Sequence, residues 1–425
     1  MKVAIAGYGV EGKVSLAYFK TRGADATVLD EREINVSELG DTSYQTGPTV
    51  FDDLSAYDLV IRTASLRPDR LSNARRIWSA TNEFFDKCPA PIIGVTGTKG
   101  KGTTASLVAG ILKAAGKTVH LVGNIGVPAL EVLPAIAVDD IVVYELSSFQ
   151  LWDLQKSPQT AVVLMIEPDH LDIHRDMEEY VAAKQQITAH QTSSDRVIYH
   201  PTNPFSKQIA GAGEGYKVRY AVPDDGGIYV RENTFFIQTN PICAVNALQL
   251  AGRHNLENAC AAISAAWSYT QDVAAIEQGL RGFSGLPHRL KLVAEVRGVK
   301  YYDDSIATTP GSAMAALKSF DAPKVIILGG SDKGADYNEI VDLCSQTGTK
   351  IIAVGQTGEV IHELAQNKGA ESRRVIGNMT EIVAAAAELA ETGTVVILSP
   401  ASASFDQYKS YADRGEQFIA AVNQL

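Results

Sequence analysis

The residues best suited to chemistry lie in a glycine-rich run, GVTGTKGKGTT, at positions 94–104. An apolar run leads into it and a helical pattern follows it. Glycines allow such a loop to curl, so that its N–H groups and the helix N-terminus face a polyphosphate. Lys101 would then place a positive charge at the β- and γ-phosphates, and a following hydroxyl would hold Mg²⁺. Gly102 stands where the strict pattern has Ser or Thr, so a turn without a ligand is the alternative. The strand–loop–helix context favours ATP binding.

A second glycine pattern, GYGVEG at positions 7–12, follows the opening apolar run, and Asp30 ends the next one. This spacing is typical of dinucleotide binding, with glycines for a tight turn and an acid for a ribose hydroxyl. The same geometry would accept the diphosphate of a UDP-sugar. An ordinary well-packed βαβ unit is the alternative, because a single match of this kind is weak.

Three further residues could take part in chemistry near these loops. Glu145 ends a buried-strand pattern, where α/β sheets place ligand contacts. His170 follows another strand pattern, and Lys184 lies in a helical pattern. Taken alone, a structural acid, a packed or surface histidine and a solvated lysine are the ordinary interpretations. A Mg²⁺ role is favoured for Glu145 because it lies beside the phosphate loop.

Short apolar runs alternate with longer helical patterns along most of the chain, which predicts an α/β fold with parallel sheets. We expect strands at residues 2–6, 26–30, 59–63, 92–96, 118–122, 141–146, 160–166, 196–200, 324–328, 350–354 and 394–398. Residues 217–239 alternate apolar and polar side chains, which predicts antiparallel hairpins. A helix is expected at residues 255–269. Domain boundaries are expected near Pro91 and Pro287.

The bulk composition limits the classes of function. A length of 425 residues predicts two or three domains. The formal net charge of -11 argues against a nucleic-acid partner, because no basic footprint is present. The four cysteines have neither CxxC nor Cys/His spacing, so we expect reduced thiols and no zinc site. No apolar run approaches the roughly 20 residues that span a bilayer. We therefore expect a cytoplasmic protein without membrane insertion.

The complete order of motifs resembles the Mur ligase family of ATP-dependent amide-bond ligases. The loop TGTKGK at 96–101 is similar to the ATP loop of these enzymes. It is also similar to that of their relative folylpolyglutamate synthase, whose version shares the Gly-Lys-Gly sequence. Further similar motifs follow in the order GNIGVPA at 123–129, ELSSFQ at 145–150, PDHLD at 168–172, AAK at 182–184, HNLEN at 254–258, GLPHR at 285–289, DDS at 303–305, LGG at 328–330 and SPASASFDQYK at 399–409.

The resemblance implies three domains. These are an N-terminal Rossmann-like domain at 1–91 that binds a UDP-sugar, a central P-loop ATPase-type parallel sheet at 92–287 that binds ATP, and a C-terminal Rossmann-like domain at 288–425 that binds an amino acid. The implied activity is the ATP-dependent addition of D-glutamate to UDP-N-acetylmuramoyl-L-alanine through an acyl phosphate, in peptidoglycan precursor synthesis. Two Mg²⁺ ions, a carbamylated Lys184 and a monomer are also implied.

The resemblance assigns roles residue by residue. Catalysis is implied for Lys101, Glu145, His170 and Lys184. Metal binding is implied for Thr103, Glu145, His170 and Lys184, with Thr104 as the alternative hydroxyl. ATP binding is implied for Gly97, Thr98, Lys99, Gly100, Lys101, Gly102, Thr103, Thr104, Asn255, Asn258, Arg289 and Asp304. Substrate binding is implied for Gly9, Asp30, Arg32, Asn124, Thr308, Lys333, Ser404 and Tyr411.

The sequence departs from the family pattern at several positions. Ile306 replaces the lysine of the usual DSKAT motif, TASL at 63–66 replaces SPGI, and Tyr411 replaces a phenylalanine. Addition of L-glutamate or another amino acid, or a non-catalytic protein that binds UDP-muramoyl ligands, therefore stays open. Folylpolyglutamate synthase is disfavoured because it lacks a nucleotide-sugar domain like the one expected at 1–91. A dehydrogenase is disfavoured because the first glycine pattern explains nothing after residue 91.

Overall fold

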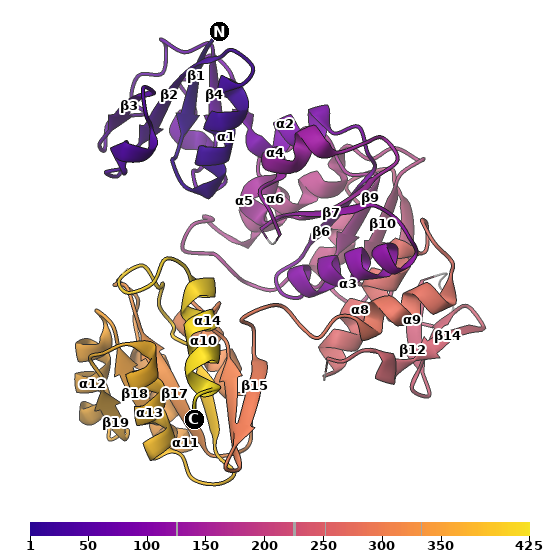
Figure 1. Ribbon diagram of the computed structural model, residues 1–425. Helices are drawn as coiled ribbons and strands as arrows, with labels where there is room; N and C mark the ends of the chain where they lie inside the picture. Colours follow the sequence, from indigo (N-terminus) through magenta and orange to yellow (C-terminus); the bar gives the residue numbers. More distant parts are fainter. Residues whose placement is uncertain (125, 224–226, 251, 333) are drawn as a thin grey trace. The chain divides into compact units, whose positions relative to one another are not determined.

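The computed structural model describes residues 1–124, 126–223, 227–250, 252–332 and 334–425 (Figure 1). These residues form two compact units, Met1–Ser284 and Gly285–Leu425. The predicted α/β fold with parallel sheets is confirmed. The division into three domains stays a prediction. None of the described helices is long and apolar enough to cross a membrane.

The first unit opens with a five-stranded parallel sheet, called here the first sheet, in the order β3-β2-β1-β4-β5. Residues Val3 to Ala6 of β1 are fully buried, because helices and loops cover both faces of the sheet. The strand order reverses between β1 and β4, where α/β sheets open a ligand crevice. The elements are β1 (Lys2–Ala6), α1 (Val10–Lys20), β2 (Asp25–Asp30), β3 (Ser43–Thr46), β4 (Leu59–Arg62), β5 (Ile77–Ser79) and α2 (Ala80–Lys87).

A second, six-stranded parallel sheet follows in the same unit, in the order β11-β10-β9-β6-β8-β7, and is called here the central sheet. Its strands are β6 (Ile92–Thr96), β7 (Val119–Gly123), β8 (Ile141–Glu145), β9 (Thr160–Val163), β10 (Arg196–Tyr199) and β11 (Tyr216–Arg219). The helices of this region are α3 (Lys101–Ala114), α4 (Ala129–Val132), α5 (Ser148–Leu151), α6 (Met177–Ala189), α7 (Pro204–Ala210), α8 (Arg253–Ala266) and α9 (Val273–Arg281).

The side chains of β8 show how this sheet builds its two cores. Ile141 and Val143 join the core beneath α3 and α8, whereas Val142 and Tyr144 join the core on the opposite face, which includes residues of α6. This alternation follows from the period of two in a strand. Because both faces are covered, the strand is apolar throughout and only its last residue, Glu145, is charged.

The hairpin prediction for residues 217–239 is partly wrong. Residues 217–219 belong to β11, which pairs parallel with β10 at the edge of the central sheet. The antiparallel sheet comes later and consists of β12 (Ile228–Arg231), β13 (Thr234–Ile237) and β14 (Asn240–Ala244). An alternating pattern suits an edge strand with one solvated side as well as a hairpin, so the pattern could not separate the two.

The second unit contains one six-stranded sheet in the order β15-β16-β20-β17-β18-β19. Among the described strands of this sheet, only the β15–β16 pair is antiparallel, and this hairpin was not among the expected strands. The strands are β15 (Lys291–Val296), β16 (Val299–Asp303), β17 (Lys324–Gly329), β18 (Lys350–Val354), β19 (Ser372–Arg374) and β20 (Val395–Leu398). The helices are α10 (Pro310–Leu317), α11 (Asn338–Thr347), α12 (Gly358–Asn367), α13 (Met379–Leu389) and α14 (Tyr411–Val422).

Candidate active site

The loop between β6 and α3 has the geometry of an anion site. Gly97 and Gly100 have φ angles of 158° and 81°, and Gly100 is the N-cap of α3. No acidic residue lies in the first turn of α3, which begins at Lys101. Lys101 Nζ donates a hydrogen bond of 2.9 Å to the carbonyl of Thr98, across the loop. The helix N-terminus and this lysine together favour a polyphosphate ligand.

Asn255 and Asn258 of α8, for which ATP binding was predicted, lie against this loop. A Cβ atom on Gly100 would stand 2.3 Å from Asn258 Oδ1, so only glycine allows this approach. Asn258 Nδ2 in turn donates a hydrogen bond of 3.3 Å to Asn255 Oδ1. The predicted residues of the loop and of α8 are therefore brought together, although they are more than 150 positions apart in the sequence.

Glu145 and Asn124 meet at the carboxyl edge of the central sheet. Glu145 is the last residue of β8 and is 3% exposed, and it pairs with Gly123 of β7 and Val95 of β6. The N–H group of Asn124 donates a hydrogen bond of 3.2 Å to the carbonyl of Glu145. The carboxylate thus belongs to the strand next to the one that leads into the phosphate loop.

Lys184 reaches the same edge from α6. Its side chain is buried, and Nζ donates to Thr96 Oγ1 at 3.3 Å and to the carbonyl of Gly97 at 3.1 Å. Burial lowers the pKa of Lys184 well below its ordinary value, and the positive charge of Lys101 lowers it further. The charges of Asp169 and Glu145 oppose this shift. A buried amine of this kind favours its neutral, nucleophilic form.

His170 lies at the surface beside this region. It has a φ of 55° and its ring is 4.9 Å from that of Phe149, and Nε2 is 3.6 Å from the carboxylate of Asp169. Among the described residues, no group of three His, Cys, Asp or Glu side chains is close enough to hold a metal ion. The role of His170 as a metal ligand stays a prediction.

The two candidate hydroxyls differ in their surroundings. Thr103 is partly exposed, whereas Thr104 is fully buried and its Oγ1 has no hydrogen-bond partner within the described part of the chain. Hydroxyl and carboxylate oxygens are the donors that Mg²⁺ prefers, so Thr103, Thr104 and Glu145 suit this ion. An ammonium group does not, so Lys184 would fit only after it acquires an acidic group. Lys99 is exposed and forms an ion pair of 3.5 Å with Glu167.

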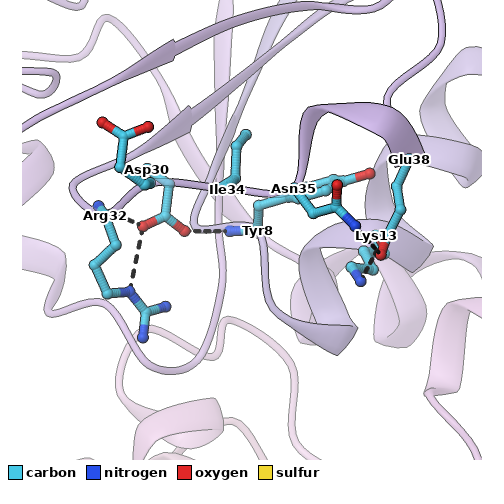
Figure 2. Close-up of a pocket in the computed structure, with 8 residues that line it drawn as sticks. Tyr8, Lys13, Asp30, Arg32, Ile34, Asn35 and Glu38 are labelled. Carbon is cyan, nitrogen blue, oxygen red and sulfur yellow. Dashed lines mark hydrogen bonds and ion pairs between the residues drawn. The ribbon is translucent and has the colours of Figure 1, made fainter.

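The first sheet carries a hollow of about 250 Å³ at the end of β2 (Figure 2). Asp30 is almost completely buried there, and its carboxylate accepts hydrogen bonds from the N–H groups of Tyr8 at 2.7 Å and Arg32 at 2.9 Å. The Arg32 guanidinium lies at 3.4 Å from the same carboxylate. Gly9, the N-cap of α1, is exposed, with open space where a side chain would be. Asp30 therefore holds the glycine loop as well as facing the hollow.

The predicted residues of the second unit gather around the ends of β16 and β20. Asp304 accepts hydrogen bonds from Ser399 Oγ at 2.7 Å and from the N–H group of Leu290 at 3.1 Å. Burial raises the pKa of Asp304 to about 6, although these bonds and Arg289 lower it. Thr308 and Tyr411 are exposed, whereas Ser404 is buried. Lys333 lies outside the described residues.

Sequence reasoning missed two buried arginines. Arg414 is buried at the start of α14, and its guanidinium donates to the Ser305 hydroxyl and to the carbonyls of Ser305, Ser402 and Ala403. It thereby joins the two loops that carry Asp304 and Ser404. Arg62, at the end of β4, is the second. The position of Arg62 at the end of an apolar run was a signal, but it did not reveal the partners, and the polar surroundings of Arg414 in the sequence gave none.

Comparison with known proteins gives a consistent family assignment. The Mur ligase middle domain matches residues 95–266, and the glutamate ligase domain of the Mur ligases matches residues 288–402. The UDP-N-acetylmuramoylalanine--D-glutamate ligase of Clostridium tetani is 34% identical over 445 residues, covering 100% of this chain and 97% of that protein. The chain belongs to the Mur ligase family. Relatives from Symbiobacterium thermophilum and Acetivibrio thermocellus, each 35% identical, carry the same name.

Solved structures share the fold. The UDP-N-acetylmuramate-alanine ligase MurC of Thermotoga maritima matches with a TM-score of 0.60 and 19% identity, over 100% of this chain and 99% of that chain. Mycobacterium tuberculosis folylpolyglutamate synthase, complexed with ADP and AMPPCP, matches with a TM-score of 0.57 and 15% identity. The match covers 80% of this chain and 94% of that chain. The match to the full-length ligase fold agrees with the presence of a first sheet before the phosphate loop.

Proposed function

We propose that this chain is an ATP-dependent ligase that joins D-glutamate to UDP-N-acetylmuramoyl-L-alanine, in peptidoglycan precursor synthesis. The observation that carries the proposal is the convergence of Lys101, Glu145 and Lys184 at one edge of the central sheet, beside a glycine loop with anion-binding geometry. The full-length relatives that carry the name of this ligase supply the substrate.

We assign one substrate to each of three regions. Residues 1–91 form a Rossmann-like domain for the UDP-sugar, with Asp30 and Arg32 at the hollow of the first sheet. Residues 92–287 form the P-loop ATPase-type domain that binds ATP. Residues 288–425 form a Rossmann-like domain in which Thr308, Lys333, Ser404 and Tyr411 bind the amino acid. A lysine, two hydroxyls and an aromatic ring suit a dicarboxylate.

The reaction has two steps. A carboxylate is a poor acylating agent, so the alanyl carboxylate first attacks the γ-phosphorus of ATP, and the bond between that phosphorus and ADP breaks. The product is an acyl phosphate. The amine of D-glutamate then attacks the acyl carbon, loses a proton, and inorganic phosphate leaves with the electron pair of the broken C–O bond.

The first step brings two anions together, so neutralisation of charge is the main task of the site. The backbone N–H groups of Gly97, Lys99 and Gly100 and the N-terminus of α3 hold the phosphates, whereas the N–H group of Thr98 is bound to the carbonyl of Met165 at 2.9 Å. Lys101 neutralises the charge that builds on the transferred group. Two Mg²⁺ ions, held by Thr103, Glu145, His170 and a carbamylated Lys184, would supply further positive charge when bound. The neutral amine that burial favours at Lys184 is the form that reacts with carbon dioxide.

A ligation assay tests the proposal. UDP-N-acetylmuramoyl-L-alanine, ATP and Mg²⁺ are supplied with D-glutamate or L-glutamate, product is identified by mass, and phosphate release is followed. We expect a glutamyl product with the D isomer only. Product with L-glutamate or another amino acid would keep the reaction type and change the substrate.

A matched pair of variants separates chemistry from binding. Lys101→Ala should lower the rate of ligation by about 10²–10³-fold, whereas Lys113→Ala, which removes an exposed lysine from the other end of the same helix, should leave it intact. Absence of product with every amino acid, despite binding of ATP and the nucleotide sugar, would instead identify a non-catalytic binding protein.

A further inference from the structure

Arg62 joins the two sheets of the first unit. It is the last residue of β4 in the first sheet, and its side chain is fully buried. Nε and Nη2 donate to the two carboxylate oxygens of Asp153 at 2.8 and 2.6 Å, and Nη2 also donates to the carbonyl of Phe149 at 3.1 Å. Both of these partners come directly after β8 of the central sheet, at or just beyond α5.

The remaining donors of Arg62 hold the loop that replaces the usual SPGI sequence. Nη1 donates to the carbonyls of Thr63 at 3.2 Å and Leu66 at 2.9 Å. All five N–H groups of the guanidinium are therefore used, which is the full capacity of this side chain. The planar guanidinium of Arg62 therefore fixes the position of the loop at 63–66 relative to the segment at 149–153.

A second charged residue ties the same loop to the first glycine pattern. The carboxylate of Glu11, in the first turn of α1, accepts a hydrogen bond of 2.6 Å from the N–H group of Ala64. Burial raises the pKa of Glu11, whereas this bond, the charge of Arg62 and a hydrogen bond from the Gln150 side chain lower it. Gln150 belongs to α5, so Glu11 also reaches across the junction.

The segment at 149–153, which Arg62 binds, packs against residues of the candidate active site. The ring of Phe149 is stacked on that of His174 at 5.3 Å and meets the ring of His170 at 4.9 Å. The ring of Trp152 lies 4.5 Å from that of His174. From the first sheet, the guanidinium of Arg67 lies 4.9 Å from the Trp152 ring and pairs with Glu179 of α6 at 2.9 Å.

We propose that the Arg62–Asp153 pair is a positioning device, which fixes the first sheet relative to the segment beside His170 and so aligns the nucleotide-sugar carboxylate with ATP. The inference rests on the proposed function, because it concerns where two substrates of that reaction meet. Neither residue touches the reacting atoms. Misplacement by about 1 Å can cost on the order of 10²-fold in rate, so a rigid junction has a direct catalytic value.

Geometry, more than stability, is the contribution expected of this pair. A buried ion pair often stabilises a fold no better than apolar residues of similar size, because both charges lose their hydration. The apolar core is already continuous across the junction, where the ring of Phe84 packs at 5.4 Å against that of Tyr144. Apolar packing holds the sheets together without directional preference, whereas the bidentate pair sets one orientation.

The first test compares two changes at the same junction. Arg62→Met combined with Asp153→Leu removes the ion pair, together with the Arg62 bonds to three backbone carbonyls, and fills the space with apolar side chains. Lys156→Ala removes the exposed ion pair between the segment after α5 and Asp86 of α2. We expect the double variant to keep its thermal midpoint within a few degrees and to lose at least about tenfold in kcat. The KM values for ATP and the nucleotide sugar should change less than about threefold. Lys156→Ala should behave as the wild type.

A merely structural role would give a different result, and that result would overturn the proposal. In that case the double variant would keep the wild-type kcat per folded molecule, with any loss of activity matched by the fraction of unfolded protein. Far-ultraviolet circular dichroism and ATP binding measure that fraction independently of turnover.

The second test does not depend on ligase activity. Spin labels at Tyr44→Cys in β3 and Tyr216→Cys in β11, both exposed positions, report the distance between the sheets in the full chain with Cys88→Ser. Pulsed electron paramagnetic resonance should give one narrow distance distribution for the parent and for Lys156→Ala, and a broadened or shifted one for the double variant. An unchanged narrow distribution in the double variant would overturn the inference. Absence of ligation by the wild type would contradict only the proposed function.

Discussion

Two strand–glycine loop–helix units in the described part of the chain share a topology and differ in charge. In the first sheet, β1 leads through Gly7 and Gly9 into α1, whereas in the central sheet β6 leads through Gly97 and Gly100 into α3. Each loop lies at the carboxyl edge of a parallel sheet, where ligands bind in such folds. The backbone alone would make both loops candidates for a phosphate.

The charged side chains around the two loops distinguish one loop from the other. The first turn of α1 carries Glu11, and Asp30 accepts the N–H group of Tyr8, so carboxylates already occupy donors near the first loop. The first turn of α3 contains no acid and begins with Lys101, whose Nζ donates to the carbonyl of Thr98 across the loop. We propose that this difference in local charge selects the ligand group: a polyphosphate at the central loop, and hydroxyl or base groups of a nucleotide at the hollow near Asp30.

Removal of the central cation should have the largest effect. Lys101→Ala is expected to lower kcat by about 10²–10³-fold, because a preorganised charge at the transferred phosphoryl group is lost. Phosphate release measured at saturating ATP gives this value, with Lys113→Ala as the control. A loss below tenfold would mean that the contrast in charge between the two loops does not govern catalysis.

Filling the space between Gly100 and Asn258 should have the next largest effect, which is on ATP affinity. Gly100→Ala places a Cβ atom 2.3 Å from Asn258 Oδ1 at a φ of 81°, whereas Gly116→Ala meets nothing within 4 Å at a φ of 75°. Both variants carry the left-handed strain of about 1–2 kcal/mol. Only Gly100→Ala should also raise the Kd for ATP, by roughly tenfold, equivalent to about 1.4 kcal/mol. Titration calorimetry of both variants checks this, and equal ATP affinities would contradict it.

A change in the first loop should act on the other substrate. Asp30→Asn removes a charged acceptor of the Tyr8 and Arg32 N–H groups, and the loss of such a bond costs about 1.5 kcal/mol or more. We expect the affinity for the nucleotide sugar to fall by roughly tenfold, with ATP affinity unchanged. Asp25→Asn, at the exposed start of the same strand, is the matched control. A parallel loss of ATP affinity would show that the two loops do not divide the substrates.

The smallest effect concerns stability and pH. Burial raises the pKa of Glu11 above its ordinary value of 4.5, so between these two values the folded protein binds more protons than the unfolded chain. The contribution of Glu11 to stability is therefore present at low pH and is lost as pH rises through the raised pKa. Glu11→Gln should remove this loss of stability. The thermal midpoint of the variant minus that of the wild type should therefore increase between pH 5 and pH 7.5. A difference that stays constant or decreases would contradict the assigned direction.

Much of the α/β framework was accessible from the sequence because it depends on short-range patterns. The strands at residues 2–6, 92–96 and 350–354 were predicted with the observed bounds, since each is an apolar run bounded by polar or glycine residues. The central loop was recognised by its glycines and lysines. The β15–β16 hairpin was missed because β15 has no buried residue and β16 alternates buried with more exposed positions, so neither strand carries a continuous apolar run.

The candidate site divides in the same manner. The sequence by itself determined the residue types and the local elements that carry them: Lys101 at a helix start, Glu145 at a strand end and Lys184 within a helix. Only the tertiary structure decided which of them meet, because strand order places β8 beside β6 and α6 beneath the loop. It alone also paired Arg62 with Asp153, 91 positions away, and set Asn258 against Gly100. Local propensity acts over a few residues, whereas burial and the pairing of buried charge depend on chain segments that only folding brings together.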